Sequence, residues 1–357
     1  MKITLSMLFA FISTCAIAQN TVCFTVEANP NISDPALSVF SKYVDVYGCS
    51  IYAESTISDE KVLHAAAVWA ELIDNDEDGI IDDPTLLSML VYNEAFMPIF
   101  HTDGNSAMTT FQTNYMGSGM SAVLFNDEVD PSQTGHWGAD ASVEEIMHTI
   151  NHVGHVNIEP TVFGLTPNSS LLSQAMDSAR GGQWVTIPAT YPSNAWYHYD
   201  DGTCNYECMA IEYLYWMQVS NMNILNDPIT CAGIVNEWEP CSPALLQSMD
   251  VLGYALITDP ANKLPQNAPD GNYCPSTLGV LEETPSAFQV YPNPANNSVT
   301  ISSNHSSGEW IVLKNTLGQV VVQKTQFSSM VTLDVSHLTA GIYFLNIGEA
   351  SHKLVIK

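Results

Sequence analysis

The 357-residue sequence carries 38 acidic and only 9 basic residues, a formal charge of −29 at neutral pH. A surface with this charge repels phosphate backbones and anionic membranes, so the composition argues against nucleic-acid binding. Because 46% of the residues are hydrophobic and 7 are tryptophan, the chain is not a disordered acidic polymer and is expected to fold.

The N-terminus has the features of a secretory signal peptide. Lys2 is followed by an apolar run over residues 3–17 and by the small-residue cleavage site Ala16-Ile17-Ala18. The run is too short for a membrane-spanning helix, and no later run approaches that length. We therefore expect removal of residues 1–18 and an exported product without a transmembrane segment.

One of the 8 cysteines lies in the signal peptide, which leaves an odd number in the mature chain. In an exported protein, cysteines form disulfides more often than metal sites. Cys23–Cys49 and Cys231–Cys241 are the simplest local pairs, and at least one cysteine must remain unpaired or pair with another molecule. An alternative for Cys204-x-x-x-Cys208 is a soft metal site, although no second pair of this kind supports it.

Residues 58–73 have the pattern of an amphipathic helix that Ser58 can cap. The helix runs directly into an acidic loop, Asp74-Asn75-Asp76-Glu77-Asp78-Gly79-Ile80-Ile81-Asp82-Asp83. Carboxylates at alternate positions, followed by glycine at the sixth, match the start of an EF-hand calcium loop. The pattern predicts calcium ligands from the side chains of Asp74, Asp76 and Asp78, the carbonyl of Ile80, and Asp82 directly or through water.

A second helix is expected from Pro84 to about Asn93, which completes a helix–loop–helix. Position twelve of the loop is Thr85, where an EF-hand has a bidentate glutamate, so the calcium affinity should be modest and the role structural. The alternative is a solvated acidic turn. However, four like charges on one tight turn repel each other unless a cation gathers them.

Short apolar runs alternate with Gly, Asn and Ser between residues 95 and 130, which is typical of strands and loops. The next segment, residues 142–155, holds two adjacent glutamates and three histidines. In a helix, Glu144, His148 and His152 form one line. A rise of about 1.5 Å per residue separates Glu144 from His152 by about 12 Å, so His148 belongs to whichever pair binds a metal.

Two assignments of this pair are open. If His148 and His152 are the ligands, Thr149 occupies the general-base position and cannot take a proton from a water on the metal. If Glu144 and His148 are the ligands, Glu145 occupies that position, one residue after the first ligand and three before the second. A carboxylate can bind zinc and can also accept a proton, so we prefer the second assignment.

The segment Glu144-Glu145-x-x-His148 resembles the H-E-x-x-H motif of the zincin metallopeptidases, with glutamate in place of the first histidine. The resemblance implies a zinc ion, a general-base role for Glu145 and hydrolysis of peptide bonds. His152 and His155 are reserve ligands or groups that stabilise the transition state. As an alternative, Ser142-x-x-Glu145 is a capping box in which Glu145 only satisfies backbone N–H groups, and the histidines are structural.

A strongly apolar helix is expected over residues 206–217. Its apolar side chains lie on nearly all sides, so the helix should be buried, and Glu207 and Glu212 then need partners. In zincins with a glutamate ligand, a second helix downstream supplies the third ligand. The resemblance implies this role for Glu212, with Glu207 second, whereas an ordinary hydrogen bond is the alternative.

Residues 259–287 are rich in Pro, Asn, Asp and Gly and are predicted to be a linker. Beyond the linker, residues 288–357 show short alternating strands separated by turn signals, a pattern typical of a small β-sandwich. A carbohydrate-binding sandwich would need exposed aromatic side chains, for which Trp310 and Tyr343 give little support.

The motifs of this segment resemble the type A sorting domain of the type IX secretion system; they are Val290-Tyr291-Pro292-Asn293-Pro294-Ala295, Asn315-Thr316-Leu317-Gly318-Gln319, Leu338-Thr339-Ala340-Gly341-Ile342-Tyr343 and Lys353-Leu354-Val355-Ile356-Lys357. The resemblance implies recognition by the type IX secretion machinery and passage across a Gram-negative outer membrane. It also implies removal of the tail, with release of the protein or its anchoring at the cell surface.

The sequence therefore predicts an α+β, zincin-like domain over residues 19–258 with an EF-hand-like calcium loop, followed by a linker and a β-sandwich. The expected function is that of a secreted zinc metallopeptidase with a structural calcium ion, acting on a protein or peptide. The alternative is a non-enzymatic, calcium-binding adhesion or binding protein that uses the same export route.

Overall fold

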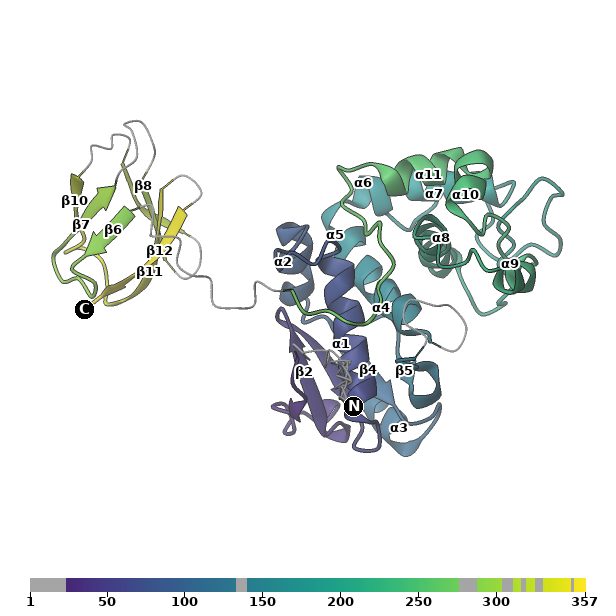
Figure 1. The fold of residues 1–357 in the computed structure, drawn as a ribbon, viewed down its shortest axis with the longest axis horizontal. Coiled ribbons are helices and arrows are strands. Elements are labelled where there is room, and N and C mark those ends of the chain that lie inside the picture. The colour runs from purple at the N-terminus through teal and green to yellow at the C-terminus, as the bar shows by residue number, and fades with distance from the viewer. Residues whose placement is uncertain are drawn as a thin grey trace, which may run out of the picture. The chain divides into compact units, whose positions relative to one another are not determined.

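The computed structural model describes residues 24–132, 140–275, 288–303, 311–315, 319–324, 330–347 and 350–357 (Figure 1). The chain divides into two compact units, residues 1–276 and 277–357. The predicted signal peptide lies outside the described residues. Among the residues that are described, no helix combines the length and the apolar character needed to cross a membrane.

The first unit contains a five-stranded sheet in the order β1-β2-β3-β4-β5. The strands are β1 (Glu27–Ala28), β2 (Lys42–Val46), β3 (Cys49–Ala53), β4 (Phe96–Phe100) and β5 (Leu124–Phe125). Strands β1 to β3 are antiparallel, and β4 and β5 continue the sheet in parallel with β3. Tyr47 and Gly48 have φ angles of 57° and 88°, as both central residues of a tight two-residue hairpin turn require.

The alternation of side chains along β3 gives the sheet two different apolar faces. Ile51 is buried in the main core. Most residues of helix α1 (Asp59–Ile73) are buried in the same core. Tyr52, the next residue, belongs to an aromatic cluster with side chains from helix α3 (Ser106–Asn114). The predicted start of α1 is confirmed, because the Ser58 side chain accepts a hydrogen bond from the backbone N–H of Lys61 at 3.4 Å. The predicted helix after the acidic loop is α2 (Pro84–Tyr92).

The rest of the first unit is mainly helical. Helix α4 (Ser142–Ile150) continues through a π-helical turn (Asn151–His155) into α5 (Val156–Ile158). It packs against α1 and against α8 (Tyr206–Asn221), which confirms the predicted buried helix over residues 206–217. The other helices are α6 (Pro160–Phe163), α7 (Leu171–Ala179), α9 (Pro228–Ile234), α10 (Pro243–Met249) and α11 (Val251–Thr258), and two 3-10 turns span Leu37–Val39 and Asn126–Glu128.

Some short helices lie where the sequence predicted only strands or irregular chain. Helix α3 interrupts the region of strands β4 and β5, and α6 and α7 lie in the segment after Pro160. Each of the two nine-residue helices begins at a polar cap: Asn105 accepts from Met108 N at 2.8 Å, and Ser170 accepts from Ser173 N at 3.0 Å. Two helical turns give too few apolar repeats for the 3.6-residue period to be recognised in the sequence.

The predicted linker begins too early. Residues 259–275 belong to the first unit, where Leu264 and Tyr273 are only 5% and 3% exposed. Lys263 Nζ also lies 3.1 Å from Asp83 Oδ1. This segment, rich in Pro, Asn, Asp and Gly, therefore has no regular secondary structure but is fixed to the first unit by side-chain hydrogen bonds.

The second unit has the predicted two-sheet architecture. One sheet has the order β10-β7-β6 and the other the order β12-β11-β8-β9. Buried side chains of both sheets, among them Ile301 and Leu345, form one apolar core. The strands are β6 (Phe288–Tyr291), β7 (Ser298–Ser303), β8 (Ile311–Asn315), β9 (Val320–Lys324), β10 (Met330–Asp334), β11 (Gly341–Ile347) and β12 (Ala350–Ile356). Trp310 lies outside the described residues.

The disulfides correct two expectations. Cys231–Cys241 is bonded as predicted, but Cys49 is a buried free thiol, so the pairing Cys23–Cys49 is wrong. Cys204 and Cys208 form a disulfide across the start of α8. Because their sulfur atoms are bonded to each other, they cannot act as the thiolate ligands of a soft metal site.

Candidate metal centre

The start of α4 leaves Glu145 free for a role other than capping. The N-cap is Ala141, which has no capping side chain, and Asp140 Oδ1 accepts from the backbone N–H of Ser142 at 3.2 Å. Ser142 is itself the first helical residue, and its hydroxyl is buried without a hydrogen-bond partner. The alternative interpretation, a capping box of Ser142 and Glu145, is therefore wrong, because Asp140 supplies the acceptor from outside the helix.

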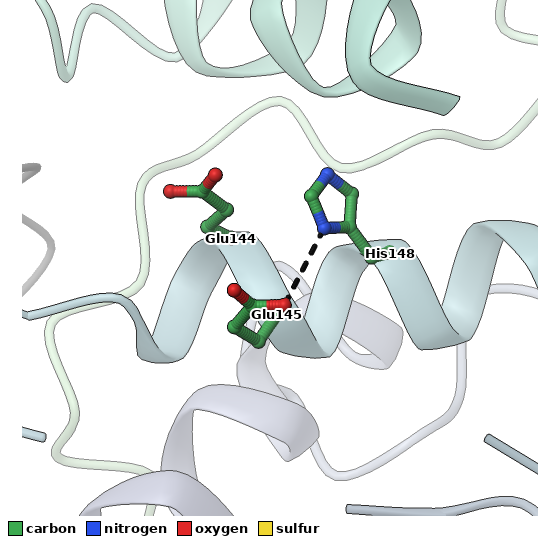
Figure 2. A group of neighbouring side chains, drawn as sticks. All are labelled: Glu144, Glu145 and His148. Carbon is green, nitrogen blue, oxygen red and sulfur yellow. Dashed lines mark ion pairs between the residues drawn. The ribbon is translucent and has the colours of Figure 1, made fainter. Parts of the chain in front are cut away.

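Three side chains of α4 form a compact group. Glu144, Glu145 and His148 can each bring one ligand atom within 4.8 Å of the other two. Figure 2 shows Glu144 and His148 projecting from the same side of the helix, with Glu145 on the adjacent side. The Nδ1 atom of His148 lies 3.6 Å from Glu145 Oε2, the pair joined by the dashed line.

Helix α8 contributes a further carboxylate to the same imidazole. Glu212 Oε2 lies 3.3 Å from His148 Nε2, but this nitrogen is buried and makes no hydrogen bond. Two ligand atoms bound at about 2.1 Å to a tetrahedral zinc ion lie about 3.4 Å apart. The distance between His148 and Glu212 is compatible with two ligands of one metal ion and equally with a direct ion pair, so the metal role that the zincin resemblance implies for Glu212 stays a prediction.

Burial and charge act against each other in this group. Burial raises the pKa of Glu144 to about 7, and Glu145 and Glu212 add to this rise, whereas His148 opposes it. For His148, burial disfavours the protonated form, but the carboxylates of Glu212 and Glu145 outweigh this effect and raise its pKa well above the ordinary value. The carboxylates thus favour positive charge at His148.

Two tyrosines, not recognised from the sequence, lie beside the candidate ligands. The Tyr215 ring meets that of His148 edge-on at 5.4 Å, and the nearby Glu144 carboxylate adds to the rise that burial causes in the pKa of Tyr215. Burial and Glu212 likewise raise the pKa of Tyr199. Both tyrosines therefore stay neutral beside the carboxylates. Tyr215 follows Glu212 by three residues on α8, a spacing that could have indicated a shared helix face.

The group lies in a cavity of about 620 Å³ between α4, α8 and the chain around β5. One wall is apolar and includes Met120, Val123, Phe125 and Ile211. The other side carries five glutamates and two histidines, and no lysine or arginine lines the cavity among the residues described: Glu128, Glu144, Glu145, Glu207, Glu212, His148 and His152. Glu207, the second choice for a ligand, is exposed at this cavity. A site of this composition favours cations.

The π-helical turn separates the other two histidines from this group. Each π-type hydrogen bond spans five residues instead of four, so the line expected for an unbroken α-helix is lost after Ile150. His152 lines the cavity but is exposed and lies outside the compact group. His155 is buried elsewhere, where its Nδ1 is 3.0 Å from Asn151 Oδ1 and its ring packs against Phe163.

His155 should make stability depend on pH. Burial lowers its pKa to about 4, against about 6.5 in an unfolded chain. The unfolded chain therefore binds an extra proton below pH 6.5, and about 3 kcal/mol of stability present above that pH is lost as the pH falls to 4. Urea unfolding followed by tryptophan fluorescence should show a smaller loss for His155→Gln than for the natural protein.

The natural protein and His155→Gln must be compared, because other groups change the stability in the opposite direction over the same pH range. Burial raises the pKa of Glu71, like that of Glu144, to about 7, so both disfavour the folded state as the pH rises from 4.5. Glu71 and Glu144 are present in both proteins, so their contributions to the pH dependence of stability cancel when the natural protein is compared with His155→Gln. Equal losses of stability in the natural protein and His155→Gln would contradict a neutral, buried His155.

The acidic loop between α1 and α2 forms a second candidate site. Asp74, Asp76 and Asp78 bring ligand atoms within 4.8 Å of one another. Asp74 is fully buried at the end of α1, and its Oδ1 atom has no hydrogen-bond partner. Its Oδ2 atom accepts from Gly79 N at 2.9 Å, and Gly79 has a φ of 86°, the left-handed conformation predicted for the sharp turn.

The remaining predicted calcium ligands lie in the second half of the loop. Ile80 follows the turn and donates its N–H to Asp78 Oδ1 at 2.7 Å. Asp82 closes the loop, because its Oδ2 atom accepts from Asn75 N at 2.8 Å. Thr85 is already in α2, and its N–H donates to the capping side chain of Asp83 at 2.9 Å. The hydrogen bond of Asp82 to Asn75 therefore brings the last predicted ligand close to Asp74, the first.

The comparison with protein families concerns the second unit. Residues 289–357 match the family described as a secretion system C-terminal sorting domain. Neither the curated proteins nor the solved structures gave a match to the chain. The matched residues contain the four sequence motifs described above and form the two-sheet fold. The second unit is therefore the type IX sorting domain of a protein destined for secretion or the cell surface.

Proposed function

We propose that the first unit is a zinc-dependent hydrolase of peptide bonds, with Glu144, His148 and Glu212 as zinc ligands. One observation carries the proposal: buried His148 Nε2 faces a cavity and lies 3.3 Å from a carboxylate on a second helix, but the two atoms do not have hydrogen-bond geometry. A buried polar atom in this state is costly unless a ligand satisfies it.

Glu145 is the proposed general base. It lies beside His148 and lines the cavity, where it can accept a proton from the attacking water and return it to the leaving amine. A bound zinc ion would act as the Lewis acid that makes this water nucleophilic. Tyr215, whose ring contacts His148, lies beside Glu144 and is placed to orient this part of the site.

The cavity favours substrates with positive charge. Glu128 and Glu207 add carboxylates beyond the proposed ligands and base, and no lysine or arginine stands among its described lining residues. The apolar wall formed by Met120 to Phe125 can hold an extended peptide. We therefore expect cleavage next to lysine or arginine in preference to aspartate or glutamate.

We also propose a structural calcium ion in the loop of residues 74–82. The buried, unpartnered Oδ1 atom of Asp74 supports it, together with the approach of Asp76 and Asp78. This loop also supports the second candidate function, a secreted binding or adhesion protein that calcium stiffens. That protein would bind calcium but no zinc.

The metal content of the purified mature protein separates these functions. We expect one zinc and one calcium per chain by elemental mass spectrometry, and loss of zinc alone in His148→Ala. His101→Ala is the matched control, because His101 is exposed and lies away from both sites. Calcium without zinc in all three proteins would contradict the hydrolase and favour the binding protein.

A further inference from the structure

The segment before the sorting domain is anchored on the candidate calcium loop. We call residues 263–273 the strap. Asn75, the second residue of the loop, makes four hydrogen bonds with it. Its Oδ1 atom accepts from Gln266 N and Asn267 N, both at 2.7 Å, and its Nδ2 atom donates to Asn267 O at 2.9 Å. The Asn267 side chain donates in return to Asn75 O at 3.0 Å.

The strap also contacts both ends of the loop. Lys263 pairs with Asp83 at the start of α2, as described above. At the other end, Gly271 N donates to Glu71 Oε2 at 3.2 Å, and the Tyr273 hydroxyl donates to Asp74 Oδ2. Asp74 is thus shared: one oxygen contacts the strap, and the other is the buried, unpartnered atom of the candidate calcium site.

The position of Asn75 links the conformation of the loop to the strap. Asn75 lies between two proposed ligands, Asp74 and Asp76, and its N–H is held by a third, Asp82. A cation that gathers these carboxylates fixes the backbone of Asn75 and so directs its side chain toward the strap. Without the cation, repulsion between the carboxylates favours a more open loop and costs the strap these hydrogen bonds.

We propose that calcium in the loop of residues 74–82 locks the strap onto α1 and α2, and that loss of calcium releases it. This inference rests on the calcium site of the proposed function and is independent of zinc. The strap is the last part of the first unit before the chain continues to the sorting domain.

Hydrogen exchange of the full mature chain tests this coupling. The amides of Gln266, Asn267 and Gly271 donate to side chains of the loop or of α1 and report strap docking directly. We expect at least tenfold slower exchange of the strap in calcium than in chelator. The calcium dependence of this protection should match that of calcium binding measured by calorimetry. Leu246 N, which donates to Ser242 O in α10, is the internal reference and should not change.

Three variants separate the steps. Asp76→Asn with Asp78→Asn should abolish calcium binding and leave the strap in fast exchange under all conditions. Asp103→Asn with Asp127→Asn removes the same charge from exposed positions elsewhere and should behave like the natural protein. Asn75→Ala should retain calcium but lose strap protection.

Two results would overturn the proposal, in different ways. Calcium binding without a change in strap exchange would refute the lock and leave the calcium site intact. Absence of calcium binding to the natural protein would refute the site itself, and with it both the lock and the structural calcium of the proposed function.

Discussion

Glu145→Gln should lower peptide hydrolysis by about a thousandfold while zinc remains bound. Glutamine has nearly the same shape as glutamate but cannot accept the proton of the attacking water. Because Glu145 is assigned as base and not as ligand, the zinc content of the variant should equal that of the natural protein. The rate should be measured on a lysine-containing peptide with saturating zinc, alongside elemental analysis of the same sample.

Glu212→Gln is the matched comparison, because it makes the same chemical change on the facing helix. We expect this variant to lose zinc as well as activity, since the amide is a far weaker ligand than the carboxylate. His152→Ala should keep its zinc. Loss of zinc in Glu145→Gln would instead show that the compact group Glu144, Glu145 and His148 binds the metal, and would remove Glu145 from the role of base.

Asp140→Ala should destabilise the first unit by about 3–5 kcal/mol, the usual cost of removing one member of a buried polar pair. Asp140 Oδ2 lies 2.7 Å from His64 Nε2, and both side chains are almost completely buried. Its other oxygen accepts from the backbone N–H of Ser142 at the start of α4. The substitution therefore leaves His64 and the first turn of α4 without their acceptor.

Urea unfolding at pH 7 measures this cost, and Asp130→Ala provides the control. Asp130 accepts from Ser132 N and Oγ only at the surface, so its removal should cost less than about 1 kcal/mol. We also expect Asp140→Ala to bind zinc at least tenfold more weakly, because α4 would lose its fixed start. Equal stability of the two variants would contradict a structural role for the buried pair.

The sequence allowed the local features of both candidate sites to be predicted, because each depends on residues close together in the chain. The acidic loop follows α1 directly, and Glu144, Glu145 and His148 share one helix. The strands of the sorting domain were also predicted, since alternation of apolar residues and turn signals suffices for a small sandwich. The contact of Glu212 with His148, 64 positions apart, came from the zincin resemblance and not from spacing.

Other features could not be predicted because they depend on contacts between distant segments. The sequence of residues 263–273 has the composition of a linker, and only its hydrogen bonds with Glu71, Asp74 and Asn75 make it part of the fold. The π-helical turn has no composition of its own, so the sequence predicted a continuous line of Glu144, His148 and His152. The wall of Met120 to Phe125 is likewise brought to α8 by the sheet.

The π-helical turn has a consequence for the choice of metal. It leaves His152 outside the compact group, so an ion between α4 and α8 meets one imidazole and two carboxylates. Such a donor set is harder than the two imidazoles of the usual peptidase motif, and it discriminates less between zinc and the oxygen-preferring ion manganese. If the proposed site binds a metal, the supply of metals outside the cell would then largely decide which ion occupies it after export.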